Sequence, residues 1–240
     1  MLADTSTRDT VEVTTAPNAG EADLTVLGRA LADTSRATIL TALMTGTAWT
    51  VGELAKHAGI ARSTASEHIT HLAAAGLVHV TRQGRHAYVT LSGPDTAAAL
   101  ETLGLLAPRR PTVASLRGQR HARELEEGRT CYRHLAGRLG VDLADSLMSS
   151  GFITSAYELT TAGRGWFTSV GVDPEAVRGV PALRPCMDWT QRRHHLAGPL
   201  ADRLARAAFE QGWIERGTHP RSVRLTGQGA RVLIGLVPTP

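Results

Sequence analysis

Cysteine and long apolar runs are scarce in this sequence, and each scarcity excludes a class of protein. Only two of the 240 residues are cysteines, too few for a disulfide framework and in keeping with a reducing compartment. No run of about 18 apolar residues occurs, so we expect no transmembrane helix and no membrane partner. Residues 1–23 lack the basic start and apolar stretch of a secretory signal. We therefore expect a cytoplasmic protein.

The motifs of common enzyme classes are also absent. The sequence has no Gly-x-Ser-x-Gly elbow, no His-Glu-x-x-His helix and no phosphate-binding glycine loop. Cys131 and His134 are residue types that can pair as nucleophile and base, but no orienting residue or oxyanion element accompanies them. We expect no enzymatic activity and no catalytic residues.

Lysine is the third scarcity, because Lys56 is the only one and nearly all positive charge is arginine. The formal net charge is +4 and the isoelectric point lies near 9.7. Guanidinium groups bind phosphate through paired donors, which suits a nucleic-acid-binding protein. A GC-rich genome produces the same bias whatever the function, so the positions of the arginines must decide.

Residues 24–106 have the pattern of a winged helix-turn-helix. Apolar residues at helical spacing predict four helices, the last ending at Gly76. Two β-prone runs follow at 77–82 and 86–92, joined by a basic hairpin tip. Another helix is predicted at about 95–106. Residues 1–20 are rich in Thr, Ser and Asp without periodicity, and we expect a disordered tail there.

The fourth helix has a polar face opposite its apolar stripe. In a helix-turn-helix the second helix enters the major groove, where small hydroxyl residues and arginine can reach bases and phosphates. Glu67 either accepts from a cytosine amino group or is simply solvated. The hairpin tip would lie over the neighbouring backbone or minor groove, unless its charges only solvate a loop. The predicted residues for binding a double-stranded DNA operator are Arg62, Ser63, Thr64, Ser66, Glu67, Thr70, Arg82, Arg85 and His86.

Several short motifs run together through this region: ALAD with Arg36, ELA at 53–55, SEHI at 66–69, LAAAGLV at 72–78, and a wing with Arg82, Gly84 and Tyr88. In this combination the region resembles the ArsR/SmtB family of transcription regulators. The resemblance implies a homodimer that binds a palindromic operator, usually as a repressor released by a ligand. We expect the helix at 95–106 and the N-terminal helix to supply the dimer contact.

The sequence departs from the resemblance at the family's usual metal sites. Metal sensors of the family often have a Cys-x-Cys pair in the helix before the recognition helix, where this sequence reads GELAKHAG. Others have Asp and His ligands in the helix after the wing, where DTAAALETLGLL contains no histidine. Ala61 stands where a capping serine is usual, which predicts a weak helix cap. Any signal should therefore be received elsewhere in the chain.

The C-terminal half contains an internal repeat. RTCYRHLAG at 129–137 recurs as RPCMDWTQRRHHLAG at 184–198, and both copies continue to a glycine, an aromatic residue and isoleucine. Leucine at every fourth position, starting at Leu135 and Leu196, predicts a long helix in each copy, then a short wing and the start of another helix. We expect the copies to pack around a shared core.

The predicted fold class is mainly α with short β-hairpins (α+β). The expected divisions are a tail at 1–20, a winged helix-turn-helix for DNA binding and dimerisation at 21–107, a basic linker or helix at 108–128, and a duplicated sensor or regulatory domain at 129–240. Within that last domain, the candidate effector or metal residues are Cys131, His134, Cys186, Asp188, Trp189, His194 and His195.

Three interpretations of these residues stay open. They bind a transition metal such as zinc, for which Cys, His and Asp are suitable ligands. Alternatively, the two cysteines form a thiol pair that senses an oxidant or electrophile. In the third, the cysteines are ordinary buried residues, no metal is bound, and a pocket between the repeats holds a small organic molecule through Trp189 and Tyr132, or the domain is purely structural.

Taken together, these features predict a signal-responsive DNA-binding regulator, with sensing in the C-terminal domain. The alternative is an architectural or constitutive DNA-binding protein whose C-terminal domain is structural or binds another protein. That alternative predicts an operator affinity that no metal, oxidant or metabolite changes.

Overall fold

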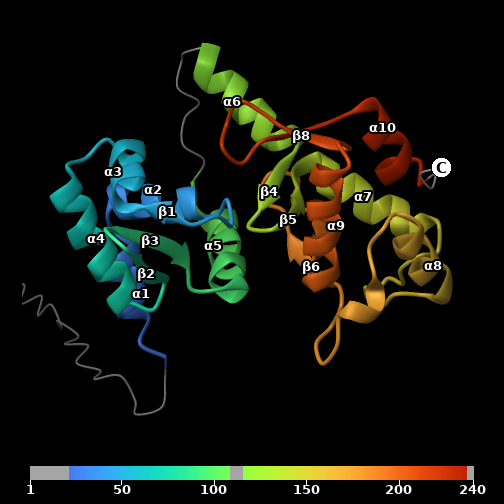
Figure 1. The fold of residues 1–240 in the computed structure, drawn as a ribbon, viewed down its shortest axis with the longest axis horizontal. Coiled ribbons are helices and arrows are strands. Elements are labelled where there is room, and N and C mark those ends of the chain that lie inside the picture. Colours follow the sequence, from blue (N-terminus) through green and yellow to red (C-terminus); the bar gives the residue numbers. More distant parts are fainter. Residues whose placement is uncertain (1–21, 109–115, 237–240) are drawn as a thin grey trace, which may run out of the picture.

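The computed structural model describes residues 22–108 and 116–236, which form an N-terminal and a C-terminal part (Figure 1). The tail expected at 1–20 lies outside these ranges, as do residues 109–115 of the linker or helix expected at 108–128. Among the described residues, no helix has both the length and the apolar character needed to cross a membrane. The N-terminal elements are α1 (Leu24–Leu31), α2 (Thr34–Leu43), β1 (Trp49–Thr50), α3 (Val51–Ala58), α4 (Arg62–Ala74), β2 (Val78–Gln83), β3 (His86–Leu91) and α5 (Pro94–Leu106).

These elements confirm the predicted winged helix-turn-helix. Helix α3 begins with a capping box, in which Thr50 and Glu53 satisfy each other's backbone N–H groups. It ends at Gly59, whose φ of +67° turns the chain toward α4. Helix α4 has no side-chain cap at Ala61, as the sequence predicted. The wing strands β2 and β3 pair antiparallel from Val78↔Leu91 to Gln83↔His86, and β1 pairs with the other edge of β3.

The ALAD motif and Arg36 join three helices of this part. Asp33 caps α2 by accepting from the backbone N–H of Arg36 at 2.9 Å. The Arg36 guanidinium donates to the carbonyls of Ala30 and Arg29, each at 2.8 Å, at the end of α1. His68 of α4 lies 3.7 Å from the Asp33 carboxylate. The recognition helix is thereby positioned by polar contacts as well as by the core.

The C-terminal part contains two successive sets of a hairpin, a helix, a short β-pairing and a second helix. The first set is preceded by α6 (Leu116–Glu127), and the short 3-10 helix η1 (Pro174–Ala176) lies between the sets. In the first set the elements are β4 (Arg129–Cys131), β5 (His134–Ala136), α7 (Gly137–Ser149), the bridge Ile153↔Leu159 and α8 (Thr161–Ser169). In the second they are β6 (Arg184–Met187), β7 (His194–Ala197), α9 (Pro199–Glu210), β8 (Ile214–Arg216), β9 (Val223–Leu225), α10 (Gly227–Gly229) and the π-helical turn η2 (Ala230–Ile234).

The recurring order agrees with the repeat seen in the sequence, but the predicted extent of its helices was wrong. Leu135 and Leu196, expected at the start of the long helices, lie on strands β5 and β7. The chain changes from strand to helix at Gly137 and Gly198, whose φ angles of +72° and +102° favour glycine. The cysteine and histidine of each copy therefore face each other across a hairpin.

The two sets exchange contacts around a shared core. Helix α7 packs on β7 of the second set, α9 packs on β5 of the first, and β5 lies against β7. The cavity between them measures about 10 Å³, room for about one water. Its lining is apolar and consists of Leu135, Gly140, Leu143, Leu196, Ala201 and Leu204. This cavity is too small for an organic ligand, but a second, more open pocket of about 400 Å³ lies between α7 of the first set and β9 and η2 of the second. Neither Trp189 nor Tyr132 lines either pocket.

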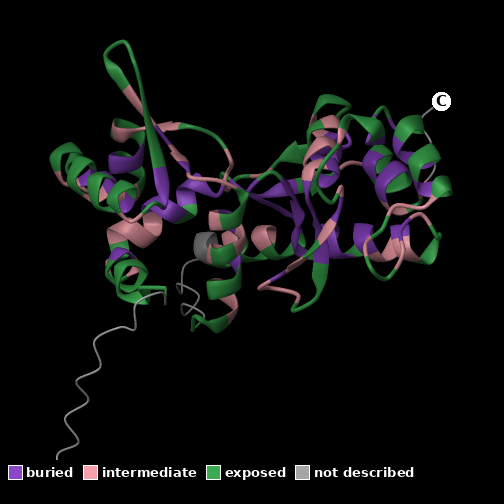
Figure 2. Ribbon diagram, turned by 90° about the horizontal axis from the view of Figure 1, so that it is seen from below, coloured by how far each residue is buried: buried purple, intermediate pink, exposed green. Residues whose placement is uncertain are grey.

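Hairpin β4–β5 connects the two parts. Cys131, Tyr132 and Ala136 are buried in the same apolar cluster as Leu40, Leu43 and other residues of the winged helix. Gly46, after α2, lies so close to the hairpin turn that a Cβ there would be 2.6 Å from the Tyr132 carbonyl oxygen. Figure 2 shows buried segments continuing through the middle of the molecule. A displacement of this hairpin would therefore act directly on the winged helix.

Candidate DNA interface and a buried cysteine–histidine cluster

The polar face of α4 is largely exposed to solvent. Ala65, Ile69 and Leu72 of α4 are buried in the core. On the opposite side, five of the six predicted residues are exposed and Thr64 is half-buried; the exposed residues are Arg62, Ser63, Ser66, Glu67 and Thr70. Thr70 donates its hydroxyl to the Ser66 carbonyl at 3.0 Å, which leaves its oxygen facing outward as an acceptor.

The tip of the wing is a two-residue loop, Gly84 and Arg85, in which Gly84 has φ +57°. Arg82, Arg85 and His86 are all exposed there, and the hairpin extends away from the body of the molecule (Figure 2). Arg85 donates from Nε to Nε2 of His86 at 3.2 Å. The predicted DNA-binding residues thus form two exposed polar surfaces, one on a helix and one on a wing.

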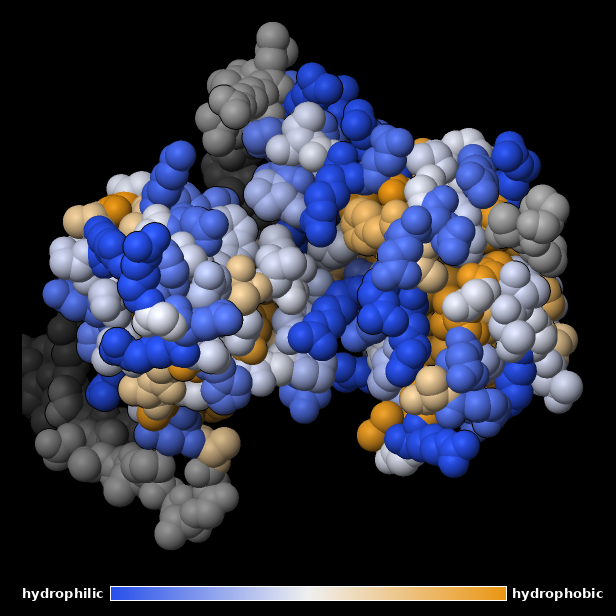
Figure 3. Space-filling model, viewed as in Figure 1, coloured by the Kyte–Doolittle hydropathy of each residue, from blue (hydrophilic) through white to orange (hydrophobic). Residues whose placement is uncertain are grey.

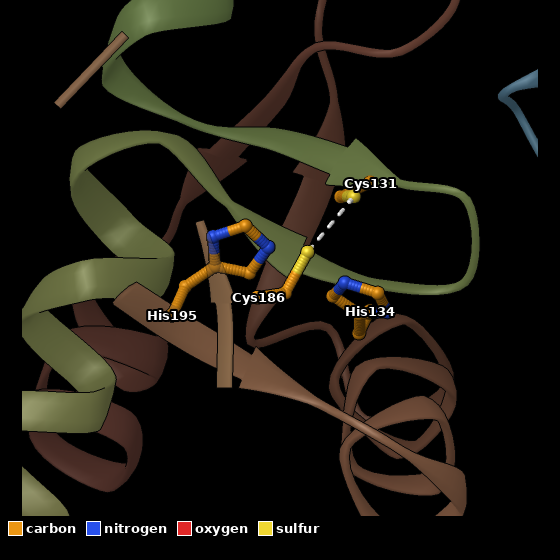
Figure 4. Close-up of side chains that lie close together, drawn as sticks. All are labelled: Cys131, His134, Cys186 and His195. Atoms are coloured by element: carbon orange, nitrogen blue, oxygen red, sulfur yellow. Dashed lines mark hydrogen bonds between the residues drawn. The ribbon is translucent and has the colours of Figure 1, made fainter. Parts of the chain in front are cut away.

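Four of the predicted effector residues meet in the C-terminal part. Cys131 on β4 pairs across the hairpin with His134 on β5, and Cys186 on β6 pairs with His195 on β7. Their ligand atoms all lie within 4.8 Å of one another (Figure 4). The two sulfurs are 4.0 Å apart and both cysteines are free, because a disulfide would bring them to about 2.05 Å. Both histidines and Cys131 are buried.

Each histidine of this cluster has a carboxylate beside its Nδ1 atom. Asp202 of α9 lies 3.4 Å from Nδ1 of His134, and Asp188 lies 3.6 Å from Nδ1 of His195. The Nε2 atoms of both rings are buried and have no hydrogen-bond partner among the described residues. The two ring planes are tilted by 33°, with 5.2 Å between their centroids. Each ring thus has a carboxylate on its outer side, but at 3.6 Å the Nδ1 of His195 makes no hydrogen bond to Asp188. The Nε2 atoms remain for the centre of the cluster.

The four groups perturb one another's protonation. The Cys131 thiol and the two imidazole rings lower the pKa of Cys186 well below the usual value for a thiol. The hydrogen bond to Cys186, together with burial, raises the pKa of Cys131. Burial opposes charge on His134, but Asp202 and Cys186 outweigh it and raise the pKa of that ring. The cluster therefore contains a stabilised thiolate beside a thiol, as favours soft-metal binding or thiol chemistry.

Behind the cluster lies a buried ion network that sequence reasoning missed. Arg129 is fully buried, and its Nη2 lies 3.1 Å from Asp188 and 3.4 Å from Glu101 of α5. Arg221 also contacts Glu101 and donates to the Thr130 carbonyl at 3.0 Å. Two signals were available in the sequence: Arg129 is the arginine of Arg-x-Cys, and Glu101 is a lone acid in the apolar middle of its helix.

Asp188 belongs to this network and to the support of His195, not to the four-atom cluster. It accepts from the backbone N–H of Gly137 at 2.6 Å, of Thr190 at 2.8 Å and of Gln191 at 3.0 Å. Burial opposes ionisation of Asp188, but Arg129 and these donors outweigh it and lower its pKa to about 2. Asp188 is therefore a fixed negative charge at the end of strand β6.

Two other candidates do not join the cluster. His194 is exposed, and its ring lies 6.4 Å from that of Tyr157. Trp189 is half-buried, with the Arg129 guanidinium 4.7 Å from its ring centroid; a Cβ at Gly104 of α5 would lie 3.8–3.9 Å from its Cβ, Cγ and Cδ1 atoms. Trp189 thus packs between the two parts of the molecule, and does not line the cavity between the repeats.

Comparisons with known proteins give matches to the helix-turn-helix region and to most of the chain. A family described as helix-turn-helix domain matches residues 31–81. The chain is 38% identical over 204 residues to the helix-turn-helix-type transcriptional regulator YdfF of Bacillus subtilis, covering 83% of this chain and 90% of that protein. This match is long enough to include most of the C-terminal part.

Two further matches concern the N-terminal part. The transcriptional regulator CmtR of Mycobacterium tuberculosis is 43% identical over 83 residues, which cover 35% of this chain and 70% of CmtR. The homodimeric winged helix-turn-helix domain of Mb0332 from Mycobacterium bovis, a possible ArsR-family regulator, is 28% identical and covers 37% of this chain and 88% of its own, with a TM-score of 0.33. Sequence motifs, fold and relatives agree, and the chain belongs to the helix-turn-helix transcriptional regulators of the ArsR type.

Proposed function

We propose that this regulator is a dimeric repressor that binds a palindromic operator and is controlled by its C-terminal domain. The observation that carries DNA reading is the exposed row Arg62, Ser63, Ser66 and Thr70 on a helix whose other face is buried. Such side chains can reach base edges in the major groove, while Arg82 and Arg85 of the wing contact phosphates. The protein would act in the cytoplasm, where it meets the operator.

The dimer contact is supported by exposed apolar residues on two helices. Leu24 of α1 is 70% exposed, and Leu106 and Leu103 of α5 are 81% and 43% exposed. Figure 3 shows apolar colouring at several places on one face: a small patch at the lower left, over the N-terminal part, and a larger area at the right, over the C-terminal part. A second copy of the chain would remove these leucines from water and place two recognition helices at the spacing of a palindrome.

Control by the C-terminal domain, proposed for 129–240, is supported by hairpin β4–β5. Its turn is buried in the winged-helix core, so the domain cannot move relative to α2 without repacking Tyr132. The same hairpin contributes Cys131 and His134 to the buried cluster. A signal received at the cluster would therefore reach the DNA-binding part through packed side chains.

The test is selection of operator DNA by the full chain from a random duplex library, followed by footprinting and sedimentation of the complex. We expect an inverted repeat with half-sites about one helical turn apart and two chains per duplex. Recovery of no preferred sequence would contradict operator reading, and a single half-site bound by one chain would contradict the dimer.

A further inference from the structure

We propose that Cys131, His134, Cys186 and His195 form a binding site for one divalent transition-metal ion of the zinc type, and that loading this site is the signal that releases the operator. The second half of this proposal rests on the proposed function; the first half does not. The site lies at the junction of hairpins β4–β5 and β6–β7, and its two cysteines border the apolar core of the winged helix-turn-helix.

The arrangement of donor atoms suits tetrahedral coordination. Metal–sulfur bonds of about 2.3 Å and metal–nitrogen bonds of about 2.0 Å place ligand atoms roughly 3.3–3.8 Å apart in a tetrahedron. The four donors here lie within 4.8 Å of one another, with the sulfurs at 4.0 Å. Figure 4 shows the Cys186 sulfur between the two rings and facing Cys131. A shift of about 1 Å or less per donor would complete the coordination.

The surroundings of the histidines indicate a metal more strongly than the donor count does. Metal-binding histidines usually donate their outer N–H to a carboxylate, which fixes the ring and leaves the other nitrogen for the ion. Asp202 lies 3.4 Å from the outer nitrogen of His134, and Asp188 lies 3.6 Å from that of His195, slightly beyond a hydrogen bond. The two Nε2 atoms are buried without a protein partner, and His195 is 0% exposed. Unpaired buried polar atoms are costly, and an ion would satisfy both.

The chemistry of two sulfurs and two imidazoles selects the class of ion. Thiolate ligands exclude magnesium and calcium, which require oxygen, and favour zinc, cobalt or a related ion. Binding takes one M²⁺ from solution, forms two M–S and two M–N bonds, and releases the remaining thiol and imidazolium protons to solvent. No electron transfer is involved. The closed four-ligand set leaves no open position for a substrate.

Two paths connect the site to the DNA-binding part. Cys131 is followed directly by Tyr132, whose carbonyl lies against Gly46 at the end of α2. On the other side, His195 contacts Asp188, which pairs with Arg129, which in turn pairs with Glu101 of α5. Closing the ligands around an ion draws β4–β5 and β6–β7 together, and both paths would transmit that movement. Helix α5 is also the proposed dimer helix.

The experiment uses the full chain, stripped with chelator under reducing conditions, and Co²⁺ as the first probe. Tetrahedral cobalt with thiolate ligands gives visible d–d bands and a near-ultraviolet charge-transfer band. We expect both to saturate at one ion per chain and to disappear on addition of Zn²⁺. Operator affinity, measured with and without Zn²⁺ by fluorescence anisotropy, should fall on loading by about 5–150-fold.

Neighbouring residues provide matched variants. Cys186→Ser and His195→Gln should each abolish or strongly weaken the cobalt spectrum. His194→Gln changes the adjacent, exposed histidine and should leave it unchanged. Near-ultraviolet circular dichroism reports whether each variant folds. If the cluster variants do not fold, the wild-type titration with elemental analysis still decides whether one ion binds.

The outcomes separate the site from the function. One cobalt per chain with weakened operator binding supports the whole proposal, and one cobalt with unchanged operator affinity overturns the signal while the site stands. No stoichiometric ion, or an ion that survives loss of both cysteines, overturns the site. Loss of operator binding through a Cys131–Cys186 disulfide in metal-free protein would assign the cluster to thiol sensing instead. Ion binding by a protein that selects no DNA would overturn the proposed function alone.

Discussion

Nη2 of Arg129 lies 3.1 Å from Oδ2 of Asp188, and neither side chain is exposed to solvent. The same guanidinium lies 3.4 Å from Glu101 of α5 and over the ring of Trp189. One arginine thus neutralises acids from two distant segments, one at the proposed dimer helix and one beside the cysteine–histidine cluster. Removal of such a partner leaves buried charges uncompensated, which costs more than the pair contributes.

We therefore expect Arg129→Met to lower the free energy of unfolding by about 3–5 kcal/mol. Arg164→Met is the matched control, because Arg164 pairs with Glu175 at 2.6 Å on the surface, where both side chains are at least 50% exposed. That change should cost about 0–1 kcal/mol. Urea denaturation at one protein concentration measures both. Equal losses in the two variants would show that the buried network does not hold the parts together.

The contact between Gly46 and the Tyr132 carbonyl gives a second stability prediction. Gly46→Ala pays for a left-handed backbone, about 1–2 kcal/mol, and also places a methyl group 2.6 Å from the carbonyl oxygen. Gly76→Ala has nearly the same φ, +71° against +72°, but no atom lies within 4 Å of its Cβ. We expect the Gly46 variant to lose a further 1–3 kcal/mol or so through overpacking. Similar melting temperatures for the Gly46→Ala and Gly76→Ala variants would mean that hairpin β4–β5 moves to accommodate the methyl group at little cost.

The winged helix-turn-helix was predictable because its signals are local. The Thr50/Glu53 capping box, Gly59 and Gly76 mark helix ends, and the wing alternates around a glycine tip. The dimer and the palindromic operator are expected from the family resemblance alone, because no local pattern contains them. The sequence departs from the family at its usual metal sites, which predicted that any signal is received in another part of the chain.

The C-terminal site was only half predictable. Self-similarity singled out the cysteines and histidines, and these do meet, but leucine spacing suggested helices where strands β5 and β7 lie. Leucines four residues apart fit a helix, but a glycine with positive φ between them starts the helix later. The positive φ of Gly137 is set by tertiary packing, which the spacing does not reveal. A Cβ at position 137 would lie 2.9 Å from the Glu126 carbonyl oxygen and clash with it. The pairing of Arg129 with Glu101 could not be predicted, because the two residues are far apart in the sequence.

Alanine substitutions of two arginines, one on each proposed DNA-binding surface, should change DNA affinity in different ways. Arg62→Ala, at the start of α4, should weaken binding to the selected operator by about 1–3 kcal/mol if Arg62 contacts a base edge, with little effect on random DNA. Arg85→Ala, on the wing, should weaken both and reduce the slope of log affinity against log salt by about one. Arg206→Ala on α9, exposed in the C-terminal part, is the control. Anisotropy titrations at several salt concentrations measure all three, and an unchanged ratio of specific to random affinity would remove Arg62 from the readout.

His219 gives the stability a pH dependence that does not involve the cysteine–histidine cluster. Its Nδ1 accepts from the backbone N–H of Arg221 at 3.2 Å, and its ring meets that of His121 edge-on at 5.6 Å. Burial and the charges of His121 and Arg221 lower the pKa of His219 from 6.5 to about 4. Between these values the unfolded chain binds a proton that the folded chain does not. The contribution of His219 is therefore complete above about pH 6.5 and is lost progressively as the pH falls toward 4.

We expect His219→Asn to flatten this part of the stability curve, because asparagine can still accept from the Arg221 N–H but cannot take up the proton. The difference between wild type and variant should change by up to about 1.4 kcal/mol per pH unit between pH 6.5 and 4. His79→Asn, on the exposed face of the wing, should retain the wild-type slope. Denaturant unfolding at a series of pH values measures the curves. Parallel curves for wild type and His219→Asn would mean that the folded chain protonates His219 as readily as the unfolded chain does.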